Sequence, residues 1–178
     1  MKKSTKKVIS AKKVISTKKF IFDLDNTLYS PLQYPETLTA YQFYNNLKPD
    51  RELSELLKKT KNNYIFTNGN KEHMDECLKK MKMKSLFKPQ HTAYNDLFGG
   101  KYKPDPHPYL FVNQRFNLKS TDTIFYFEDL TENLKTGKKM GWITVYIDHE
   151  RKMKKKPTYI DIVTDNIYDA ITICLNQK

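Results

Sequence analysis

The stretch that decides the fold is Phe20-Ile21-Phe22-Asp23-Leu24-Asp25-Asn26-Thr27-Leu28-Tyr29. An apolar run of β-favouring residues stops at two aspartates spaced i, i+2, and a threonine follows them. The run predicts a buried strand over residues 19–24, which delivers both aspartates at its carboxyl end. One carboxylate placed there can attack a phosphorus atom as a nucleophile, while the other transfers protons.

Length and composition predict a soluble chain with one domain. The 178 residues are enough for a substantial core, and hydrophobic residues make up 38% of them. No apolar run approaches the roughly 20 residues of a membrane span, so we expect no such span. The two cysteines, Cys77 and Cys174, match no disulfide or zinc spacing, which favours a reducing, cytoplasmic or other intracellular location.

The net charge of +12 is concentrated near the N-terminus. Residues 1–19 hold eight lysines and no acid, and the remainder has 24 basic and 20 acidic residues. We therefore expect residues 1–18 to be a flexible, basic tail of low complexity, with the repeat KKSTKK, VISAKK, VISTKK. A solubility tail, a segment that binds nucleic acid or an anionic membrane, and a nuclear-import signal all fit this composition. A second basic run, residues 151–156, fits either a solvated loop or a patch beside the site.

From residue 19 onward, expected strands alternate with expected helices. The strands are 19–24, 64–66, 90–94, 123–127, 142–147 and 159–163, and the helices are 36–47, 50–61, 70–82, 106–117, 130–140 and 166–174. This alternation predicts an α/β fold with a parallel sheet and helices on both faces, in one domain over residues 19–178. Such sheets bind ligands at the carboxyl ends of their strands, near the switch in strand order.

Four polar clusters accompany these strands. They are Asp23-x-Asp25-x-Thr27, Thr67-Asn68-Gly69, Lys103-Pro104, and Glu128-Asp129 with Asn133. Phosphoryl transfer requires these residue types: a nucleophilic carboxylate, a second carboxylate for protons, oxygen ligands for Mg²⁺, and a hydroxyl and a lysine for the phosphate. Each cluster alone has a structural alternative, such as an acidic turn, a strand-ending turn, a surface lysine or a helix cap. Their order and shared place at strand ends favour the catalytic interpretation.

In their order, the four motifs resemble those of the haloacid dehalogenase (HAD) superfamily of phosphohydrolases, over roughly residues 19–147. The resemblance implies a three-layer, Rossmann-like core, a Mg²⁺ ion and an aspartyl-phosphate intermediate. It implies catalytic roles for Asp23 as nucleophile, Asp25 as general acid/base, Thr67 as phosphate-binding hydroxyl and Lys103 as the lysine that pairs with nucleophile and phosphate. It further implies phosphate contacts from Thr27, Asn68 and Gly69, and metal ligation by Asp23, by the backbone carbonyl of Asp25 and by Asp129, with Glu128 and Asn133 as additional candidates.

Within the superfamily, the segments FDLDNTLY, TNG, KPDP and FEDLTENL most resemble the pyrimidine 5′-nucleotidase branch. That resemblance implies a small nucleotide monophosphate as substrate. The branch inserts a helical cap after its first motif, but only about 36 residues separate Thr27 from Tyr64 here. Residues 30–48 would therefore hold a minimal cap or none. An open site also fits a phosphate on a polynucleotide end or a phosphoprotein, and a non-catalytic binding module with the same fold is the remaining alternative.

Aromatic residues gather in and around this shortened interval, at Tyr29, Tyr34, Tyr41, Phe43 and Tyr44. Aromatic rings beside an open site can stack a nucleobase. Rings at such positions equally serve to pack a short helix onto the core.

Overall fold

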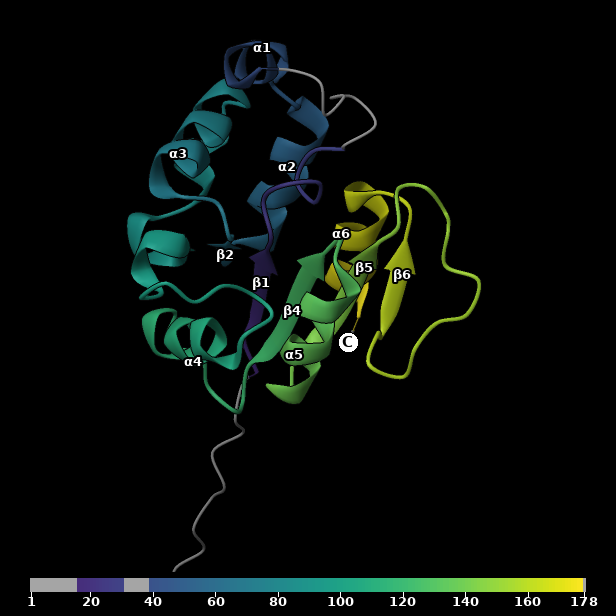
Figure 1. The fold of residues 1–178 in the computed structure, drawn as a ribbon. Coiled ribbons are helices and arrows are strands. Elements are labelled where there is room, and N and C mark those ends of the chain that lie inside the picture. The colour runs from purple at the N-terminus through teal and green to yellow at the C-terminus, as the bar shows by residue number, and fades with distance from the viewer. Residues whose placement is uncertain (1–15, 31–38, 178) are drawn as a thin grey trace, which may run out of the picture.

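The computed structural model describes residues 16–30 and 39–177 of the protein. Most of the expected tail, residues 1–15, and residues 31–38 of the expected minimal cap lie outside this range. The strands are β1 (Lys18–Phe22), β2 (Asn63–Phe66), β3 (Thr92–Ala93), β4 (Thr123–Glu128), β5 (Ile143–Ile147) and β6 (Ile162–Thr164). The helices are α1 (Ala40–Asn46), α2 (Arg51–Thr60), α3 (Lys71–Lys80), α4 (Pro106–Arg115), α5 (Thr131–Lys139) and α6 (Ile167–Asn176) (Figure 1).

The six strands form one parallel sheet in the order β3-β2-β1-β4-β5-β6. This is a common order of doubly wound α/β folds, and it confirms the expected Rossmann-like architecture. β1 lies at the centre, with Phe22 paired to Ile65 of β2 on one side and to Phe127 of β4 on the other. The chain reverses its winding direction at β1, so the carboxyl end of β1 opens onto the crevice where such folds bind ligands.

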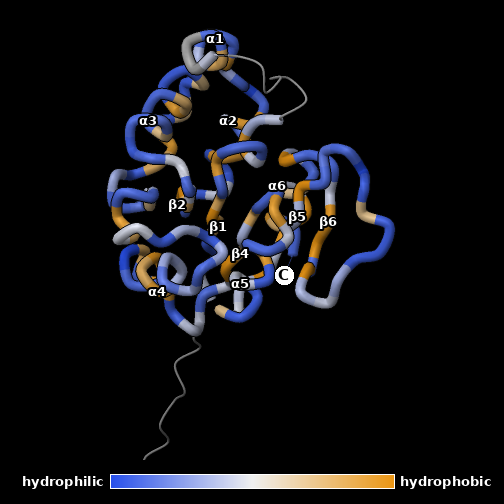
Figure 2. The backbone as a smooth tube through the Cα atoms, in the orientation of Figure 1, coloured by the Kyte–Doolittle hydropathy of each residue, from blue (hydrophilic) through white to orange (hydrophobic). Residues whose placement is uncertain are grey.

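Alternate residues of the strands enter two separate hydrophobic layers. Phe20 and Phe22 of β1 pack with residues of α2, α3 and α6, whereas Ile21 packs with residues of α4 and α5. Phe22 and Phe127 stack with ring centroids 4.6 Å apart in the first layer. Figure 2 shows the apolar strands enclosed between helices, with hydrophilic residues along most connecting loops. Both faces of the sheet are therefore covered, and the ends of the strands are left for the site.

The expected elements are present, and three of them differ in extent for local reasons. α1 begins at Ala40 rather than at residue 36, because the Thr39 side chain caps it by accepting from the Gln42 N–H. β3 is shorter than expected because Pro89–His91 form a 3₁₀ turn in front of it. β6 begins at residue 162 because the Ile160 N–H donates to the Pro157 carbonyl and closes a turn. Asp50 and Asn70 cap α2 and α3 as their sequence positions predict.

The first strand begins one residue before the expected start at residue 19. Lys18 is the first residue of β1, and its Nζ donates to the carbonyls of Cys174 (3.1 Å) and Leu175 (2.9 Å) at the end of α6. A lysine at this place satisfies terminal carbonyl groups and complements the helix dipole. Within residues 16–30 and 39–177, no helix has the length and apolar character needed to cross a membrane.

Gly137 allows α5 to approach β4 closely. A Cβ at this position would lie 2.6 Å from Cδ1 of Tyr126 and 3.4 Å from Cε3 of Trp142. We expect Gly137→Ala to lower the free energy of unfolding by about 1–3 kcal/mol through overpacking. Helix propensity alone would instead raise it by about 1 kcal/mol.

Urea and thermal unfolding, followed by circular dichroism, measure this change. Lys135→Ala in the same helix is the control, because the Lys135 side chain is 49% exposed, and it should change stability by less than about 0.5 kcal/mol. A Gly137→Ala variant more stable than the wild type would contradict the tight contact between α5 and Tyr126.

Candidate active site

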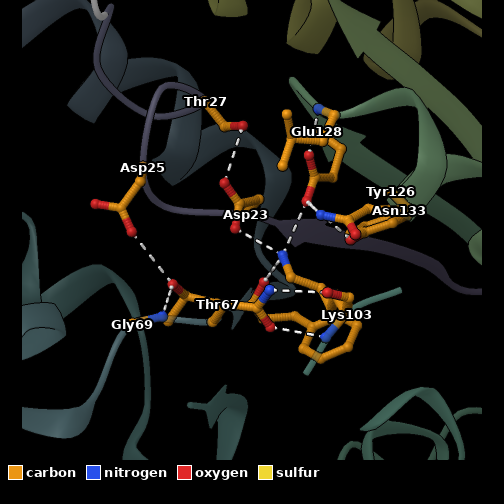
Figure 3. A network of polar contacts seen from close by, with 12 residues as sticks. Asp23, Asp25, Thr27, Thr67, Gly69, Lys103, Tyr126, Glu128 and Asn133 are labelled. Carbon is orange, nitrogen blue, oxygen red and sulfur yellow. Dashed lines mark hydrogen bonds and ion pairs between the residues drawn. The ribbon is translucent and has the colours of Figure 1, made fainter. Parts of the chain in front are cut away.

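The four motifs meet at the carboxyl ends of β1, β2 and β4 (Figure 3). They surround a cavity of about 150 Å³ lined by Asp23, Asp25, Asn26, Asn68, Lys103, Glu128, Asp129, Leu130 and Asn133. Pockets that enclose a whole small-molecule ligand are typically about 300–1,000 Å³. This cavity therefore has room for a reacting group, while the rest of a substrate would lie outside it.

Asp23 follows β1 directly and is nearly buried, with 6% exposed. Its N–H donates to the Phe127 carbonyl at 2.9 Å, which continues the sheet pairing to the loop that carries Asp25 and Thr27. Thr27 Oγ1 donates to Asp23 Oδ2 at 3.2 Å, so the buried threonine orients this carboxylate. Burial raises the pKa of Asp23, against the opposing effect of the Lys103 ammonium group.

Lys103 places its ammonium group among three strand ends. Nζ donates to Asp23 Oδ1 at 2.7 Å, to Glu128 Oε1 at 2.9 Å and to the Phe66 carbonyl at 2.8 Å. Burial disfavours the charged ammonium form, but the two carboxylates outweigh that cost and raise the pKa of Lys103. The lysine is thus held charged beside the Asp23 carboxylate.

Asn68 holds the loop that carries this lysine. Its side-chain amide donates to the Lys103 carbonyl at 3.1 Å, and the Lys103 N–H donates to its Oδ1 at 2.8 Å. The side chain of Asn68 is therefore committed to the Lys103 backbone, so a phosphate contact from Asn68 would come from its backbone N–H.

Glu128 is saturated with donors from its own surroundings. Besides Lys103, its Oε1 accepts from Asn133 Nδ2 at 2.5 Å and from the Tyr126 hydroxyl at 3.3 Å. Its Oε2 accepts from the Leu130 N–H at 2.6 Å, ahead of α5. Glu128 therefore binds both the Lys103 ammonium group and the backbone N–H ahead of α5, and Asn133 helps to hold the Glu128 carboxylate. Both residues also lie beside the candidate metal ligands.

Asp23, Glu128 and Asp129 form an acidic group that can hold a cation. One oxygen from each carboxylate lies within 4.8 Å of the other two. Burial first, and then the negative charge of Glu128, raise the pKa of Asp129 to about 7. A single lysine cannot neutralise three carboxylates, and a hard divalent cation prefers such oxygen ligands. The residues present therefore fit Mg²⁺, which would favour the ionised form of Asp129.

Asp25 lies beside this group but faces different partners. Thr67 Oγ1, which is itself buried, donates to Asp25 Oδ2 at 3.4 Å and accepts from the Gly69 N–H at 2.9 Å. Burial alone would raise the pKa of Asp25, but hydrogen bonds from His73 and Tyr29 lower it overall. The Asp25 side chain remains 36% exposed, so it can reach a group outside the cavity.

His73 is a site residue that the sequence motifs did not reveal. Its Nε2 lies 2.5 Å from Asp25 Oδ1, and its Nδ1 lies 2.8 Å from the Tyr44 hydroxyl. The hydrogen bond to Asp25 raises the pKa of His73. Gly69 leaves space for the ring, because a Cβ there would lie 2.8 Å from His73 Cδ2. The only sequence signal was position: His73 falls in the first turn of α3, the helix that follows the Thr67-Asn68-Gly69 motif.

The aromatic residues and the basic run make packing and polar contacts in the described residues, and the ligand-binding alternatives for both stay predictions. Tyr29, Phe43 and Tyr44 pack at the edge of the first hydrophobic layer and around His73, whereas Tyr34 and the Tyr41 side chain lie outside the description. The basic run 151–156 belongs to the crossover from β5 to β6, where Arg151 pairs with Asp165 and Lys156 donates to the Asp161 carbonyl at 2.8 Å.

Comparison with known proteins identifies the family. Residues 33–147 match the family of haloacid dehalogenase-like hydrolases, so the chain belongs to that family. Comparison with curated protein sequences finds no match. The match begins after Asp23 and Asp25, so the placement of these two residues at the site is a result of the structure.

Solved structures share the fold at low identity. An L-2-haloacid dehalogenase from Xanthobacter autotrophicus, with chloropropionic acid covalently bound, has a TM-score of 0.68 at 11% identity, covering 92% of this chain and 100% of that one. A Thermotoga maritima protein provisionally named β-phosphoglucomutase has a TM-score of 0.63 at 15% identity, with 88% and 98% covered. A HAD family hydrolase from Deinococcus radiodurans, with bound phosphate and sodium, has a TM-score of 0.53 at 14% identity, with 72% and 79% covered.

Removal of the Lys103 charge tests whether the buried ammonium group stabilises the folded protein. Lys103→Met would leave Asp23 and Glu128 as buried carboxylates without their ammonium partner. We expect the free energy of unfolding at neutral pH to fall by about 3–5 kcal/mol, measured by urea unfolding.

The matched control is Lys71→Met, which removes a lysine that pairs with Asp75 and whose side chain is 59% exposed. It should cost less than about 1 kcal/mol. Equal losses in the two variants would show that the buried ammonium group does not stabilise the site.

Proposed function

We propose that the protein is a Mg²⁺-dependent phosphomonoesterase that acts through an aspartyl-phosphate on Asp23. The observation that carries this proposal is the pairing of two different carboxylates at one strand end. Asp23 is buried against Lys103 and faces Asp129, whereas Asp25 is half-exposed and hydrogen-bonded to Thr67 and His73. The first arrangement suits a nucleophile, and the second suits a proton donor and acceptor.

The reaction follows from these positions in two steps. An Asp23 oxygen forms a bond to phosphorus as the bond to the leaving alcohol oxygen breaks, and Asp25 passes a proton from its pair with His73 to that oxygen. Asp25 then accepts a proton from water, whose oxygen attacks phosphorus and releases inorganic phosphate and the Asp23 carboxylate. Lys103 and the Thr67 hydroxyl hold the phosphate oxygens. Asp23, Asp129 and the Asp25 carbonyl would hold Mg²⁺, which would offset the repulsion between carboxylate and phosphate.

Two features favour a phosphate ester as substrate over a haloacid, the kind of substrate named for the dehalogenase structures. A halide leaves as a stable anion and requires no proton, whereas an alkoxide requires one, which Asp25 and His73 are placed to supply. A phosphate dianion also needs more positive charge than Lys103 alone provides. The acidic group at Asp129 supports binding of the cation that would add this charge.

The motifs and the small cavity support one class of substrate. The resemblance to pyrimidine 5′-nucleotidases favours a nucleotide monophosphate, whose base would lie outside the 150 Å³ cavity. α1 is the single helix that the described residues show between β1 and α2, which supports a minimal cap in this interval. An exposed site of this kind also accommodates a phosphorylated polynucleotide end or protein. A binding module without catalysis is the less favoured alternative, because the two carboxylates and Lys103 are assembled.

Asp23→Asn tests the proposed nucleophile. We expect phosphatase turnover to fall by at least about 10³-fold with little change in fold, because an amide cannot attack phosphorus. The assay measures phosphate release from a generic aryl phosphate ester, with and without Mg²⁺. Glu132→Gln, at an exposed acid in the first turn of α5, should keep full activity. Unchanged turnover in Asp23→Asn, or after chelation of metal, would refute the proposed chemistry.

A substrate panel tests the class of leaving group. We expect UMP and CMP to be hydrolysed faster than 5′- or 3′-phosphorylated oligonucleotides and a phosphopeptide, and L-2-chloropropionate to release no chloride. Chloride release would favour dehalogenation, and faster turnover of the macromolecules would favour the alternative substrate class.

The same panel, run with a chain that lacks residues 1–15, tests the basic tail. This truncation retains Lys18, which belongs to β1 and binds the end of α6. We expect nucleotide turnover to stay unchanged. A loss of oligonucleotide turnover together with its salt dependence would show that the tail captures nucleic acid.

A further inference from the structure

A second cluster of metal-ligating side chains consists of Asp25, His73 and Cys77. His73 and Cys77 are four residues apart on α3 and therefore share one face of that helix. Cys77 Sγ lies 3.7 Å from His73 Nε2, and the same Nε2 lies 2.5 Å from Asp25 Oδ1. One ligand atom from each of the three residues lies within 4.8 Å of the other two.

The second ring nitrogen of His73 has a hydrogen-bond partner of its own. Its Nδ1 is hydrogen-bonded to the Tyr44 hydroxyl at 2.8 Å, which fixes the ring and directs Nε2 toward Asp25 and Cys77. The ring also stacks near Phe43, with centroids 6.1 Å apart. Metal-bound histidines generally use their second ring nitrogen in this way, and such partners orient the ligand.

The donor set selects a different cation from the acidic group. A thiolate, an imidazole nitrogen and one carboxylate oxygen are typical ligands of Zn²⁺, whereas Mg²⁺ prefers oxygen alone. The S···N separation of 3.7 Å is close to that between two ligands of one tetrahedral zinc ion, for bonds of about 2.3 Å and 2.0 Å. The side chains of His73 and Asp25 are 25% and 36% exposed, so an ion can enter from their side above the buried thiol.

We propose that Asp25, His73 and Cys77 form an inhibitory Zn²⁺ site. Zinc binding replaces the hydrogen bond between His73 Nε2 and Asp25 with one bond from each to the ion. The proton on His73 Nε2 and the thiol proton of Cys77 are released to solvent, and His73 Nδ1 keeps the proton that it donates to the Tyr44 hydroxyl oxygen. A water molecule completes the fourth position. The inhibitory consequence rests on the proposed function, because bound zinc would occupy the Asp25 carboxylate that transfers protons. Zinc binding itself does not depend on that function.

Cobalt(II) reports the thiolate ligand directly, without any activity assay. We expect one equivalent of Co²⁺ to give the near-ultraviolet absorption of a cobalt–thiolate bond and Zn²⁺ to remove it by displacement. Cys77→Ala and Cys77→Ser should lose this band, while Cys174→Ala, at the other buried free cysteine, should keep it. Asp23→Asn should also keep it, because Asp23 belongs to the acidic group. Circular dichroism verifies that each variant is folded.

Inhibition tests the consequence for turnover. We expect Zn²⁺ to inhibit the wild type in saturating Mg²⁺, and Cys77→Ala to keep basal activity while needing at least about tenfold more Zn²⁺ for half inhibition. Zinc that merely replaced Mg²⁺ at Asp23 and Asp129 would be displaced by added Mg²⁺ and would inhibit Cys77→Ala equally.

The outcomes separate the two proposals. A wild type without the cobalt–thiolate band, or a Cys77→Ala variant that retains it, would overturn the zinc site. Equal zinc inhibition of the wild type and Cys77→Ala would overturn its inhibitory role. A cobalt–thiolate band in a protein that hydrolyses no phosphate ester would instead leave the zinc site standing and refute the phosphatase.

Discussion

The ammonium group of Lys103 joins the ends of three strands at the centre of the sheet. It contacts Asp23 after β1, the Phe66 carbonyl at the end of β2 and Glu128 at the end of β4. Removing one partner of a buried ion pair costs several times more than removing a surface pair, because the remaining charge has no water to solvate it. The loop that carries Lys103 is in turn held through its backbone by Asn68. The packing of the strands, the conformation of the loop that carries Lys103 and the orientation of the Asp23 carboxylate thus depend on one another.

The same lysine leaves the site short of positive charge. It faces Asp23 and Glu128 together, and Asp129 lies beside them with its pKa raised to about 7. A divalent cation at this group would supply charge both for the carboxylates and for an anionic substrate. Glu128 accepts hydrogen bonds from Lys103, Asn133, Tyr126 and Leu130, whereas each Asp23 oxygen accepts one, from Lys103 or Thr27. Asp23 is therefore less occupied by protein donors than Glu128.

Asp25 connects this acidic group to a softer set of ligands. It is hydrogen-bonded to His73, which packs against Gly69 and lies within 4 Å of the Cys77 sulfur. One carboxylate is therefore shared between a site suited to proton transfer and a set of atoms suited to zinc. The same geometry that would supply the proton would make the site sensitive to a thiophilic cation.

Local patterns in the sequence determined the strands, the helices and the four motifs. Phe20, Ile21 and Phe22 form an apolar run that predicts a buried strand, and Asp50 and Asn70 are typical helix caps. These signals act over a few residues, so they can be recognised without knowledge of the fold. The first residues of β3 and β6 could not be predicted in this way, because they depend on which backbone groups form hydrogen bonds in the turns that precede these strands. Tertiary structure alone brought His73 and Cys77 to Asp25, 48 residues away from His73 in the chain. No spacing rule marks that group, since its members meet only when the carboxyl ends of parallel strands are brought to one edge of the sheet.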